Sequence, residues 1–342
     1  MTALVIGVDG GGTSTRCVVA TVSGEVAGRG YGGGSNILSS ADPGGSLRGA
    51  LLAALAGLDP GEVTAGVFGL AGGDSARERT EAVAAEAWRA AGLPGRPSVV
   101  SDALAAFAGA TAEASGAVLI AGTGAVAARI DDRRVTGRAD GYGWLLGDEG
   151  SGTWIGRRAV RAVLASVDGR AAPTALLGCF GDAAEPAPSR SPEQAGPGPA
   201  APGPLGSAGS APSAPSAPSA QEIVRLVHAG IAESGPAWLA RLAPAVEAAA
   251  RDGDAAATAI LDEAARRLAA TVGALGPVSG PLVLAGSLLT EPTLLAGKVR
   301  AGLAGTVVTA RDSAAGAAAL ALHAAGAGAV PDPLAAHRRL IG

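Results

Sequence analysis

The chain opens with an apolar run and a glycine-rich turn, Leu4-Val5-Ile6-Gly7-Val8 followed by Asp9-Gly10-Gly11-Gly12-Thr13. A second apolar stretch from Cys17 to Val22 comes directly after the turn, and Ser23-Gly24 leads into a third stretch from Val26. Short apolar runs bounded by glycine and polar residues are typical of β-strands. We therefore expect a meander of three strands, with the glycine loop as its first connection.

The same order of features returns at domain spacing. The apolar run Ala117 to Ile120 precedes Ala121-Gly122-Thr123-Gly124, and a further run from Ala125 to Ile130 leads through Asp131-Asp132 into another strand from Arg133. A supersecondary unit that occurs twice indicates two related lobes. The repeat lies in the pattern, with little residue identity.

Helical and strand patterns alternate between the two units. We expect helices at 47–58, 76–91 and 103–112, and strands at 66–70 and 98–101. Such alternation predicts the α/β class with largely buried sheets. We place an N-terminal lobe at 1–112 and a C-terminal lobe at 113–342.

Residues 183–220 interrupt this pattern. They hold ten of the 22 prolines, tandem Ser-Ala-Pro steps, no aromatic residue, and Leu205 as their one large aliphatic side chain. Such a composition cannot bury enough apolar surface to offset the entropy of ordering, which predicts a disordered insertion. After it we expect a long helix from about Asp254, a strand at 282–284, and an Ala-rich terminal helix capped by Asp312 or Ser313.

Composition excludes several classes of function. Charged residues make up 16% and the net charge is -4, so no electrostatic field favours nucleic acid or anionic lipid. Lys298 is the only lysine, which argues against a Schiff base or a Walker-type phosphate loop. Cys17 and Cys179 are too few for a disulfide framework, and no signal peptide is evident, so we expect a cytoplasmic protein. The Ala- and Gly-rich run at 314–330 reads as a buried helix and not as a membrane span.

The first glycine loop has the chemistry of a phosphate site. Consecutive glycines let backbone N–H groups converge on an anion, Thr13 adds a hydroxyl donor, and Asp9 at a strand end can hold a hydrated Mg²⁺. An ordinary hairpin turn is the alternative, although Asp-Gly suffices for one. A second loop at Gly122-Thr123-Gly124 lets the two turns clamp a nucleotide's phosphates from both sides. Arg16 is then a candidate cation.

Asp102 has two competing interpretations. It follows the apolar strand at 98–101 and precedes a helix, so its carboxylate lies at the carboxyl end of a strand, where open α/β sheets bind ligands. It could there accept the proton of a sugar hydroxyl as a phosphoryl group arrives. On position alone, the commoner role for such a residue is to cap the helix.

Other polar residues are equally open. The loop Gly147-Asp148-Glu149-Gly150-Ser151-Gly152 suits polyol recognition or simply starts a helix, and Asn36 is either a ligand or part of an Asx turn. Surface or core roles are expected for the three histidines, His228, His323 and His337, and the pair Arg266-Arg267 reads as solvated.

Taken in order along the chain, these motifs resemble the N-acetylglucosamine kinase and BadF/BadG/BcrA/BcrD ATPase family. The motifs are Val8-Asp9-Gly10-Gly11-Gly12-Thr13, Gly34-Ser35-Asn36, Ser101-Asp102-Ala103, Ala121-Gly122-Thr123-Gly124, Gly147-Asp148-Glu149-Gly150-Ser151-Gly152 with Trp154-Ile155-Gly156, and Ala285-Gly286. The resemblance implies a two-lobed actin-like ATPase (ribonuclease H-like) fold, with duplicated mixed sheets flanked by helices and a central cleft.

The resemblance also implies roles for individual residues. Binding of ATP falls to Gly11, Gly12, Thr13, Gly122, Thr123, Gly124, Gly253, Gly286 and Ser287, and Mg²⁺ to Asp9. The amino sugar falls to Asn36, Asp102, Gly141, Tyr142, Gly143 and Asp148, with Asp102 as catalytic base. Two departures from the family pattern are Ser14, where many members carry Lys or Arg, and Tyr142, where the animal kinases carry tryptophan.

We therefore expect an ATP-dependent amino-sugar kinase acting on N-acetylglucosamine to give the 6-phosphate, with glucosamine as the alternative substrate. An ATPase activator of a radical acyl-CoA dehydratase or reductase is the alternative from another class, and neither cysteine is well placed for the iron–sulfur cluster such proteins ligate. A non-catalytic nucleotide-dependent module would lack the acids retained here. Relatives are often dimers, so the resemblance makes a homodimer one candidate for the oligomeric state.

Overall fold

The computed structural model describes residues 3–12, 14–37, 40–72, 76–180, 218–326 and 328–342. Within these residues the strands form two five-stranded sheets. The first sheet has the order β3-β2-β1-β4-β5 and comprises β1 (Leu4–Gly10), β2 (Thr15–Thr21), β3 (Val26–Gly32), β4 (Val63–Leu70) and β5 (Ser98–Ser101). The second has the order β10-β9-β6-β7-β8 and comprises β6 (Gly116–Ala121), β7 (Ala125–Asp131), β8 (Arg134–Asp140), β9 (Leu282–Ala285) and β10 (Val307–Thr309).

The two sheets have the same topology. In the first, β1, β2 and β3 form an antiparallel meander, while β4 pairs parallel with β1, and β5 pairs parallel with β4. In the second, β6, β7 and β8 repeat the meander, β9 pairs parallel with β6, and β10 pairs parallel with β9. The prediction of two duplicated mixed sheets is confirmed.

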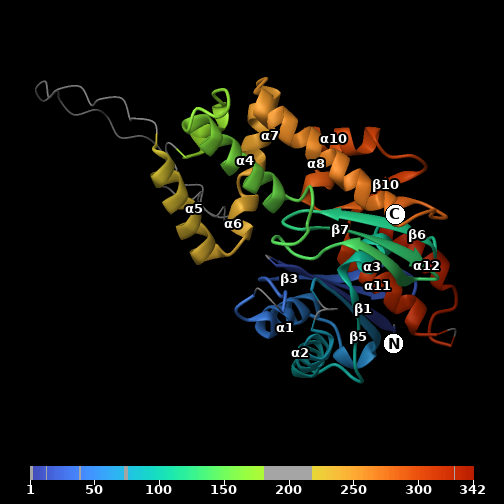
Figure 1. Ribbon diagram of the computed structural model, residues 1–342. Coiled ribbons are helices and arrows are strands. Elements are labelled where there is room, and N and C mark those ends of the chain that lie inside the picture. The colour runs from blue at the N-terminus through green and yellow to red at the C-terminus, as the bar shows by residue number, and fades with distance from the viewer. Residues whose placement is uncertain (1–2, 13, 38–39, 73–75, 181–217, 327) are drawn as a thin grey trace, which may run out of the picture.

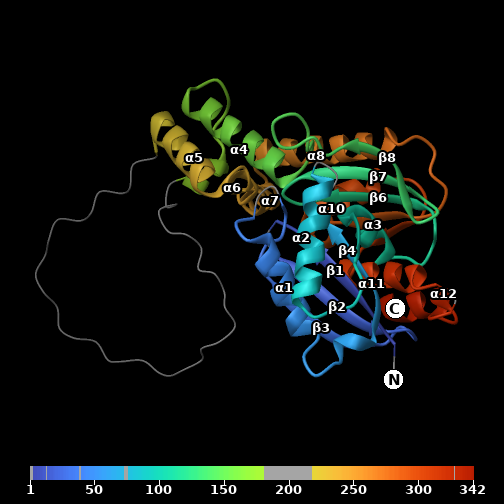
Figure 2. The ribbon, with the colours of Figure 1, turned by 90° about the horizontal axis from the view of Figure 1, so that it is seen from below.

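Helices cover the outer faces of both sheets (Figure 1). The first sheet packs against α1 (Pro43–Ala54) and α2 (Arg77–Ala90), and the short helix η1 (Pro60–Glu62) precedes β4. The second sheet carries a larger set: α4 (Gly152–Val167), η2 (Ala175–Phe180), α5 (Ala220–Ser234), α6 (Ala237–Ala240), α7 (Ala243–Arg251), α8 (Ala255–Gly273), α9 (Ser287–Thr290) and α10 (Leu294–Ala301). Figure 2 shows α5 and α6 beside α4, at one end of this lobe.

Two helices lie between the sheets. They are α3 (Asp102–Ala108), which follows β5, and α11 (Ser313–Ala324), which follows β10, so the duplication extends to them. Their alanines form one core with the inner faces of both sheets, and α12 (Pro333–Ile341) packs against α11. Close approach requires glycine: a side chain at Gly7 would meet the Ala318 nitrogen at 2.0 Å, and one at Gly316 would meet the Ala105 carbonyl at 2.1 Å.

Some predicted boundaries differ from the observed ones. Helix α3 ends at Ala108 and not at residue 112, and the Ala-rich run at 314–330 is helical only to Ala324. Strand β10 was not expected, because three residues give too short a pattern to recognise. The Asp312 carboxylate caps α11, as predicted, and the helix expected from about Asp254 is α8, which the Asp254 carboxylate caps.

The predicted insertion at 183–220 lies outside the described residues up to residue 217. Its last residues belong to the start of α5, because the Ser219 hydroxyl accepts from the Glu222 N–H and the Glu222 carboxylate accepts from the Ser219 N–H. The helix therefore begins within the range assigned to the insertion. The division at residue 112 stays a prediction, and α11, from the second range, packs on β1 of the first sheet.

Candidate active site

Asp9 lies near the carboxyl end of β1, on the face of the first sheet that carries the central helices. Side chains alternate along a strand, so Asp9 faces the same side as Gly7, which contacts α11. Its antiparallel partner on β2 is Arg16. Burial is the main cause of a pKa of about 7 at Asp9; the Asp102 charge adds to the rise and the Arg16 charge opposes it. The two predicted acids are thus close enough for their charges to interact.

Asp102 is the first residue of α3. The residue that caps the helix is Ser101, whose hydroxyl accepts from the Leu104 N–H at 3.3 Å. The Asp102 carboxylate accepts from the Ala103 N–H at 2.9 Å. The sequence offered a capping role or a ligand-binding role for Asp102, and the neighbouring Ser101 fills the capping role. Because β1, β4 and β5 are parallel, their carboxyl ends lie along one edge of the sheet, so Asp9 and Asp102 lie at the same edge with β4 between their strands.

The first glycine loop is joined to the segment containing Asn36. The Gly11 carbonyl accepts from the Ser35 N–H at 2.9 Å and from the Asn36 N–H at 3.1 Å. Gly12 is exposed, as a loop that approaches a ligand requires. The predicted donor Thr13 lies outside the described residues. A predicted sugar residue and a predicted phosphate loop are therefore adjacent.

The second glycine loop is held against the start of α4. The Gly122 N–H donates to the Gly124 carbonyl at 2.9 Å, and the Gly152 N–H donates to the Gly122 carbonyl at 2.7 Å. The Thr153 hydroxyl donates to the Thr123 carbonyl at 2.7 Å. The carbonyl groups of this loop are thus bonded to protein.

Asp148 lies against the second glycine loop. Its carboxylate accepts from the Ala125 N–H at 3.3 Å, and a side chain at Gly124 would come within 3.0 Å of it. Burial is the main cause of a raised pKa at Asp148; the Ala125 N–H opposes the rise and the Asp140 charge adds to it. Asp148 and the phosphate loop therefore form one local unit.

The loop before Asp148 carries the other predicted sugar residues. Gly141 and Gly143 have φ of 80° and 85°, left-handed values that glycine tolerates. Between them the Tyr142 side chain is 72% exposed. The Trp144 carbonyl accepts from Arg157 at 2.8 Å, which ties the loop to α4. The side chain that replaces the family's tryptophan thus stands open to solvent.

The predicted adenosine residues are divided. Gly286 has a φ of 84° and packs against the Ala121 backbone, at the base of the second glycine loop, and Ser287 begins α9. Gly253 follows α7 with a φ of 88°, and a side chain placed there would meet no atom within 4 Å. The structure joins Gly286 and Ser287 to the second loop and gives no contact that joins Gly253 to it.

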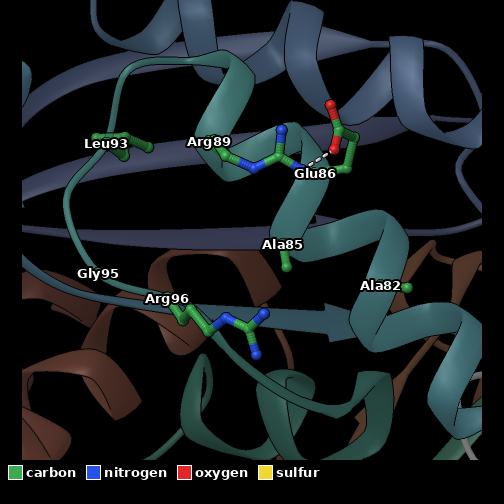
Figure 3. Close-up of a pocket in the computed structure, with 7 residues that line it drawn as sticks. All are labelled: Ala82, Ala85, Glu86, Arg89, Leu93, Gly95 and Arg96. Carbon is green, nitrogen blue, oxygen red and sulfur yellow. Dashed lines mark hydrogen bonds and ion pairs between the residues drawn. The ribbon is translucent and has the colours of Figure 1, made fainter.

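Two cavities lie outside this constellation. One of about 230 Å³ is lined by Arg16, Cys17, Arg29, Tyr31, Arg311 and Asp312, with Arg29 paired to Asp312 at 2.6 Å. It adjoins Asp9 through Arg16. Another, of about 630 Å³, lies on the α2 flank (Figure 3), lined by residues between Ala82 and Arg96. None of its lining residues belongs to the predicted site.

No group of three or more His, Cys, Asp or Glu side chains in the described ranges is arranged to hold a metal ion by itself. Magnesium usually takes one or two carboxylates together with substrate phosphates, and Asp9 alone can supply that smaller set. No helix in the described part of the chain is both long and apolar enough to cross a bilayer.

A model of a known protein family matches most of the chain. The model of the BadF/BadG/BcrA/BcrD ATPase family matches residues 6–321, which include both glycine loops, all of α3 and most of α11. The chain belongs to this family. The resemblance inferred from the ordered motifs is confirmed.

Named relatives of this ATPase family member include sugar kinases. An N-acetylmuramic acid/N-acetylglucosamine kinase of Clostridium acetobutylicum is 34% identical over 178 residues, which are 51% of this chain and 58% of the relative. A glucosamine kinase of Vibrio cholerae is 31% identical over 175 residues, 48% of this chain and 55% of the relative. The chain thus spans just over half the length of the curated relatives it matches.

Solved structures agree on the fold. A candidate N-acetylglucosamine kinase from Chromobacterium violaceum has a TM-score of 0.68 at 26% identity, covering 94% of this chain and 99% of that one. A ROK-family glucokinase from Streptomyces griseus, solved with glucose and AMPPNP, has a TM-score of 0.55 at 19% identity, covering 94% and 100%. The two-lobed actin-like architecture is confirmed.

The sequence did not reveal two residues of this family member's site. Asp140 reads as the end of a strand, yet its carboxylate accepts from the Gly141, Asp148 and Glu149 N–H groups, each at 2.8 Å. Arg267, expected to be solvated, bonds to Glu149 from α8. Asp140 stands immediately before a glycine-rich loop, which is a weak signal. Nothing in the sequence links residue 267 to residue 149.

Proposed function

We propose that this protein is an ATP-dependent amino-sugar kinase that transfers the γ-phosphoryl group of ATP to the 6-hydroxyl of N-acetylglucosamine. The proposal rests chiefly on the placement of Asp9 and Asp102 at the carboxyl ends of the parallel strands β1 and β5, where the Asp102 charge contributes to the raised pKa of Asp9. Strand ends are the ligand-binding edge of such sheets. The named relatives support an amino sugar as the acceptor.

Asp102 is the base in this proposal. Its carboxylate takes the proton of the sugar hydroxyl as that oxygen bonds to the γ-phosphorus, while the bond from phosphorus to the bridging oxygen of ADP breaks. Ser101 performs the capping, so the Asp102 carboxylate is not required for the first turn of α3. Asn36 and Asp148 would orient the sugar by hydrogen bonds to its hydroxyl and amide groups.

Charge neutralisation involves Asp9 and Arg16. The partly buried Asp9 carboxylate, near the end of β1 beside the first glycine loop, would hold the Mg²⁺ that accompanies the phosphates. Mg²⁺, when bound, supplies positive charge to the phosphate oxygens. Arg16, the cross-strand neighbour of Asp9, adds a guanidinium on the same face. The Gly11 and Gly122 N–H groups donate to carbonyls within their own loops, so other backbone N–H groups of the two loops would complete the phosphate contacts.

Glucosamine is the second candidate acceptor. It is favoured by the similarity to the glucosamine kinase, at 31% identity over 175 residues. An activator of radical enzymes is disfavoured, because Cys17 is 1% exposed and burial raises its pKa to about 12, which opposes the thiolate form that ligates iron. We place the protein in the cytoplasm as part of the same proposal.

The test is a coupled assay of ADP release with ATP and Mg²⁺. The acceptor panel contains N-acetylglucosamine, N-acetylmuramic acid, glucosamine, N-acetylmannosamine and glucose. We expect the highest kcat/KM with N-acetylglucosamine and a 6-phosphate product by NMR. Turnover that prefers glucose, or ADP release that no sugar stimulates, would reject the proposed function.

A further inference from the structure

The loop that links β8 to α4 holds two non-glycine residues in an uncommon backbone conformation. Asp140 has a φ of 64° and Asp148 a φ of 55°, values in the left-handed region. Such conformations persist only where surrounding contacts enforce them. The contacts that enforce them therefore determine where the Asp148 carboxylate lies.

The first of these contacts is made within the loop. Oδ1 of Asp140 accepts from the N–H groups of Gly141 and Asp148, and Oδ2 accepts from the Glu149 N–H. Gly147 packs against the same carboxylate, where a side chain would come within 2.2 Å of Oδ1. One carboxylate thus closes the base of the loop.

The second contact comes from α8, outside the loop. Arg267 donates to the Glu149 carboxylate and, through Nε, to Glu263 at 2.6 Å. Its guanidinium carbon lies 5.5 Å from the centre of the Trp154 ring, and Trp154 is 4% exposed. A cation over an aromatic face is attracted to it, so Arg267 is fixed by three partners. Glu149 is consequently held to a helix that is distant in sequence.

This contact reaches the phosphate loop. Glu149 is the neighbour of Asp148, whose carboxylate accepts from the Ala125 N–H at the end of the second glycine loop. Both loops therefore keep their relative position only if the backbone at residues 148 and 149 stays fixed. The Arg267 side chain is 45% exposed and that of Glu149 is 33% exposed. Ion pairs at such exposure add little to global stability, so orientation is the larger effect expected of this one.

We propose that Arg267 is a positioning residue of the kinase reaction, which acts through Glu149 to hold Asp148 in place for the sugar. The inference rests on the proposed function. It requires no contact between Arg267 and either substrate. It also assigns a role to the contact that Arg267 makes between α8 and the start of α4.

Arg266→Ala provides the matched control. Arg266 immediately precedes Arg267 on α8. Among the described residues Arg266 forms an ion pair with Glu263, while Arg267 forms ion pairs with both Glu263 and Glu149. Arg267→Ala should lower kcat/KM for the sugar about 10-fold and leave the KM for ATP within about twofold, whereas Arg266→Ala should change neither. Arg267→Lys keeps the positive charge but lacks the planar guanidinium with its several N–H donors. Its kcat/KM for the sugar should therefore lie between those of the wild type and Arg267→Ala.

A double-mutant cycle identifies the path of the effect. Glu149→Gln should reproduce the sugar defect, and the double variant Arg267→Ala with Glu149→Gln should be no worse than either single variant. Additive losses, or equal behaviour of the Ala variants at 266 and 267, would overturn the proposal. So would a parallel loss of sugar and ATP affinity together with a large fall in Tm.

Hydrogen exchange separates this inference from the function itself. The amides of Asp148 and Glu149 donate to Asp140, so their exchange reports the loop geometry without any turnover. In Arg267→Ala we expect these amides to exchange at least about 10-fold faster than in Arg266→Ala. If no sugar supports ADP release but this difference appears, only the proposed function fails. If the wild-type protein phosphorylates the sugar but the amides of Asp148 and Glu149 exchange equally fast in Arg267→Ala and Arg266→Ala, only the positioning role fails.

Discussion

At the scale of single residues, two acids at one sheet edge should have separable effects. Asp102→Asn removes the base but leaves the capping serine in place, so kcat should fall by about 10²–10⁴-fold while both KM values stay within a few fold. Steady-state ADP release measures this directly. Ser101→Ala is the control, because it removes the cap and should cost about 1 kcal/mol of stability with a much smaller loss of kcat. Near-normal turnover in Asp102→Asn would remove Asp102 from the mechanism.

The Asp9 carboxylate should lower the stability of the fold at neutral and higher pH. Its folded pKa is about 7 against 3.8 in the unfolded chain, so the folded state binds more protons between these values. Stability contributed by this group is therefore greatest below about pH 4 and is lost as pH rises towards 7. In metal-free buffer at pH 8, Asp9→Asn should raise the free energy of unfolding by about 1–3 kcal/mol, with little gain at pH 4.5. Urea denaturation at both pH values measures the difference, and an equal effect at both would contradict it.

The same residue scale shows why part of the site escaped the sequence. Asp9, Asn36 and Asp148 each belong to a short glycine-rich motif, so local chemistry suffices to find them. Arg267 reaches Glu149 across 118 positions, and only the packing of α8 against the start of α4 makes that contact. No local pattern encodes it.

At the scale of elements, a histidine pair joins α11 and α12 to α3. The His323 and His337 rings meet at 3.2 Å between Nε2 and Nδ1, and Nε2 of His337 lies 2.7 Å from the Ala108 carbonyl. Burial is the main cause of a pKa of about 4 at His323, and the Arg133 and His337 charges contribute to the lowering. Burial is also the main cause of a lowered pKa at His337. Of the surface or core roles expected for the histidines, His337 has the core role, because it is 1% exposed.

The lowered pKa predicts a loss of stability in acid. Between about pH 6.5 and 4 the unfolded chain binds a proton at His323 that the folded chain does not, so stability falls as pH falls through this window. His323→Gln does not titrate and should reduce the loss between pH 7.5 and 5 by about 1–2 kcal/mol. Chemical denaturation of both proteins at these pH values tests it. His228→Gln, a change at an exposed position of α5, serves as the control and should leave the dependence unaltered.

Elements with strong local patterns were predicted well, and those fixed by packing were not. The meanders at β1–β3 and β6–β8 follow from apolar runs and turns. The 3-residue β10 exists because it pairs with β9 and precedes α11, a context the sequence pattern cannot supply. Likewise, α11 ends where its buried alanines end, and the apolar run continues beyond it.

At the scale of the whole molecule, the duplication explains the position of the site. Each lobe supplies a glycine loop between its first two strands, and each sends a helix, α3 or α11, into the shared core. Because that core contains the inner faces of both sheets, relative movement of the lobes must be accommodated around α3 and α11. The alternation of elements predicted the α/β class, the repeat predicted two related lobes, and the family resemblance implied the actin-like architecture. The packing of α11 on β1 required the structure.

The proline-rich segment is expected to be dispensable to this architecture. Its composition predicts disorder, and the core of the second lobe is complete from η2 to α5 without it. Replacing residues 183–217 by about ten Gly and Ser residues should leave kcat within twofold and raise the free energy of unfolding by about 1 kcal/mol, since a shorter loop costs less closure entropy. A matched deletion that extends through Ala220 should lose that gain, because it removes the Ser219 side of the capping box and the first residue of α5. Thermal denaturation and ADP release on both variants decide the matter, and a collapse of kcat in the shorter replacement would mean that the segment docks on the lobes.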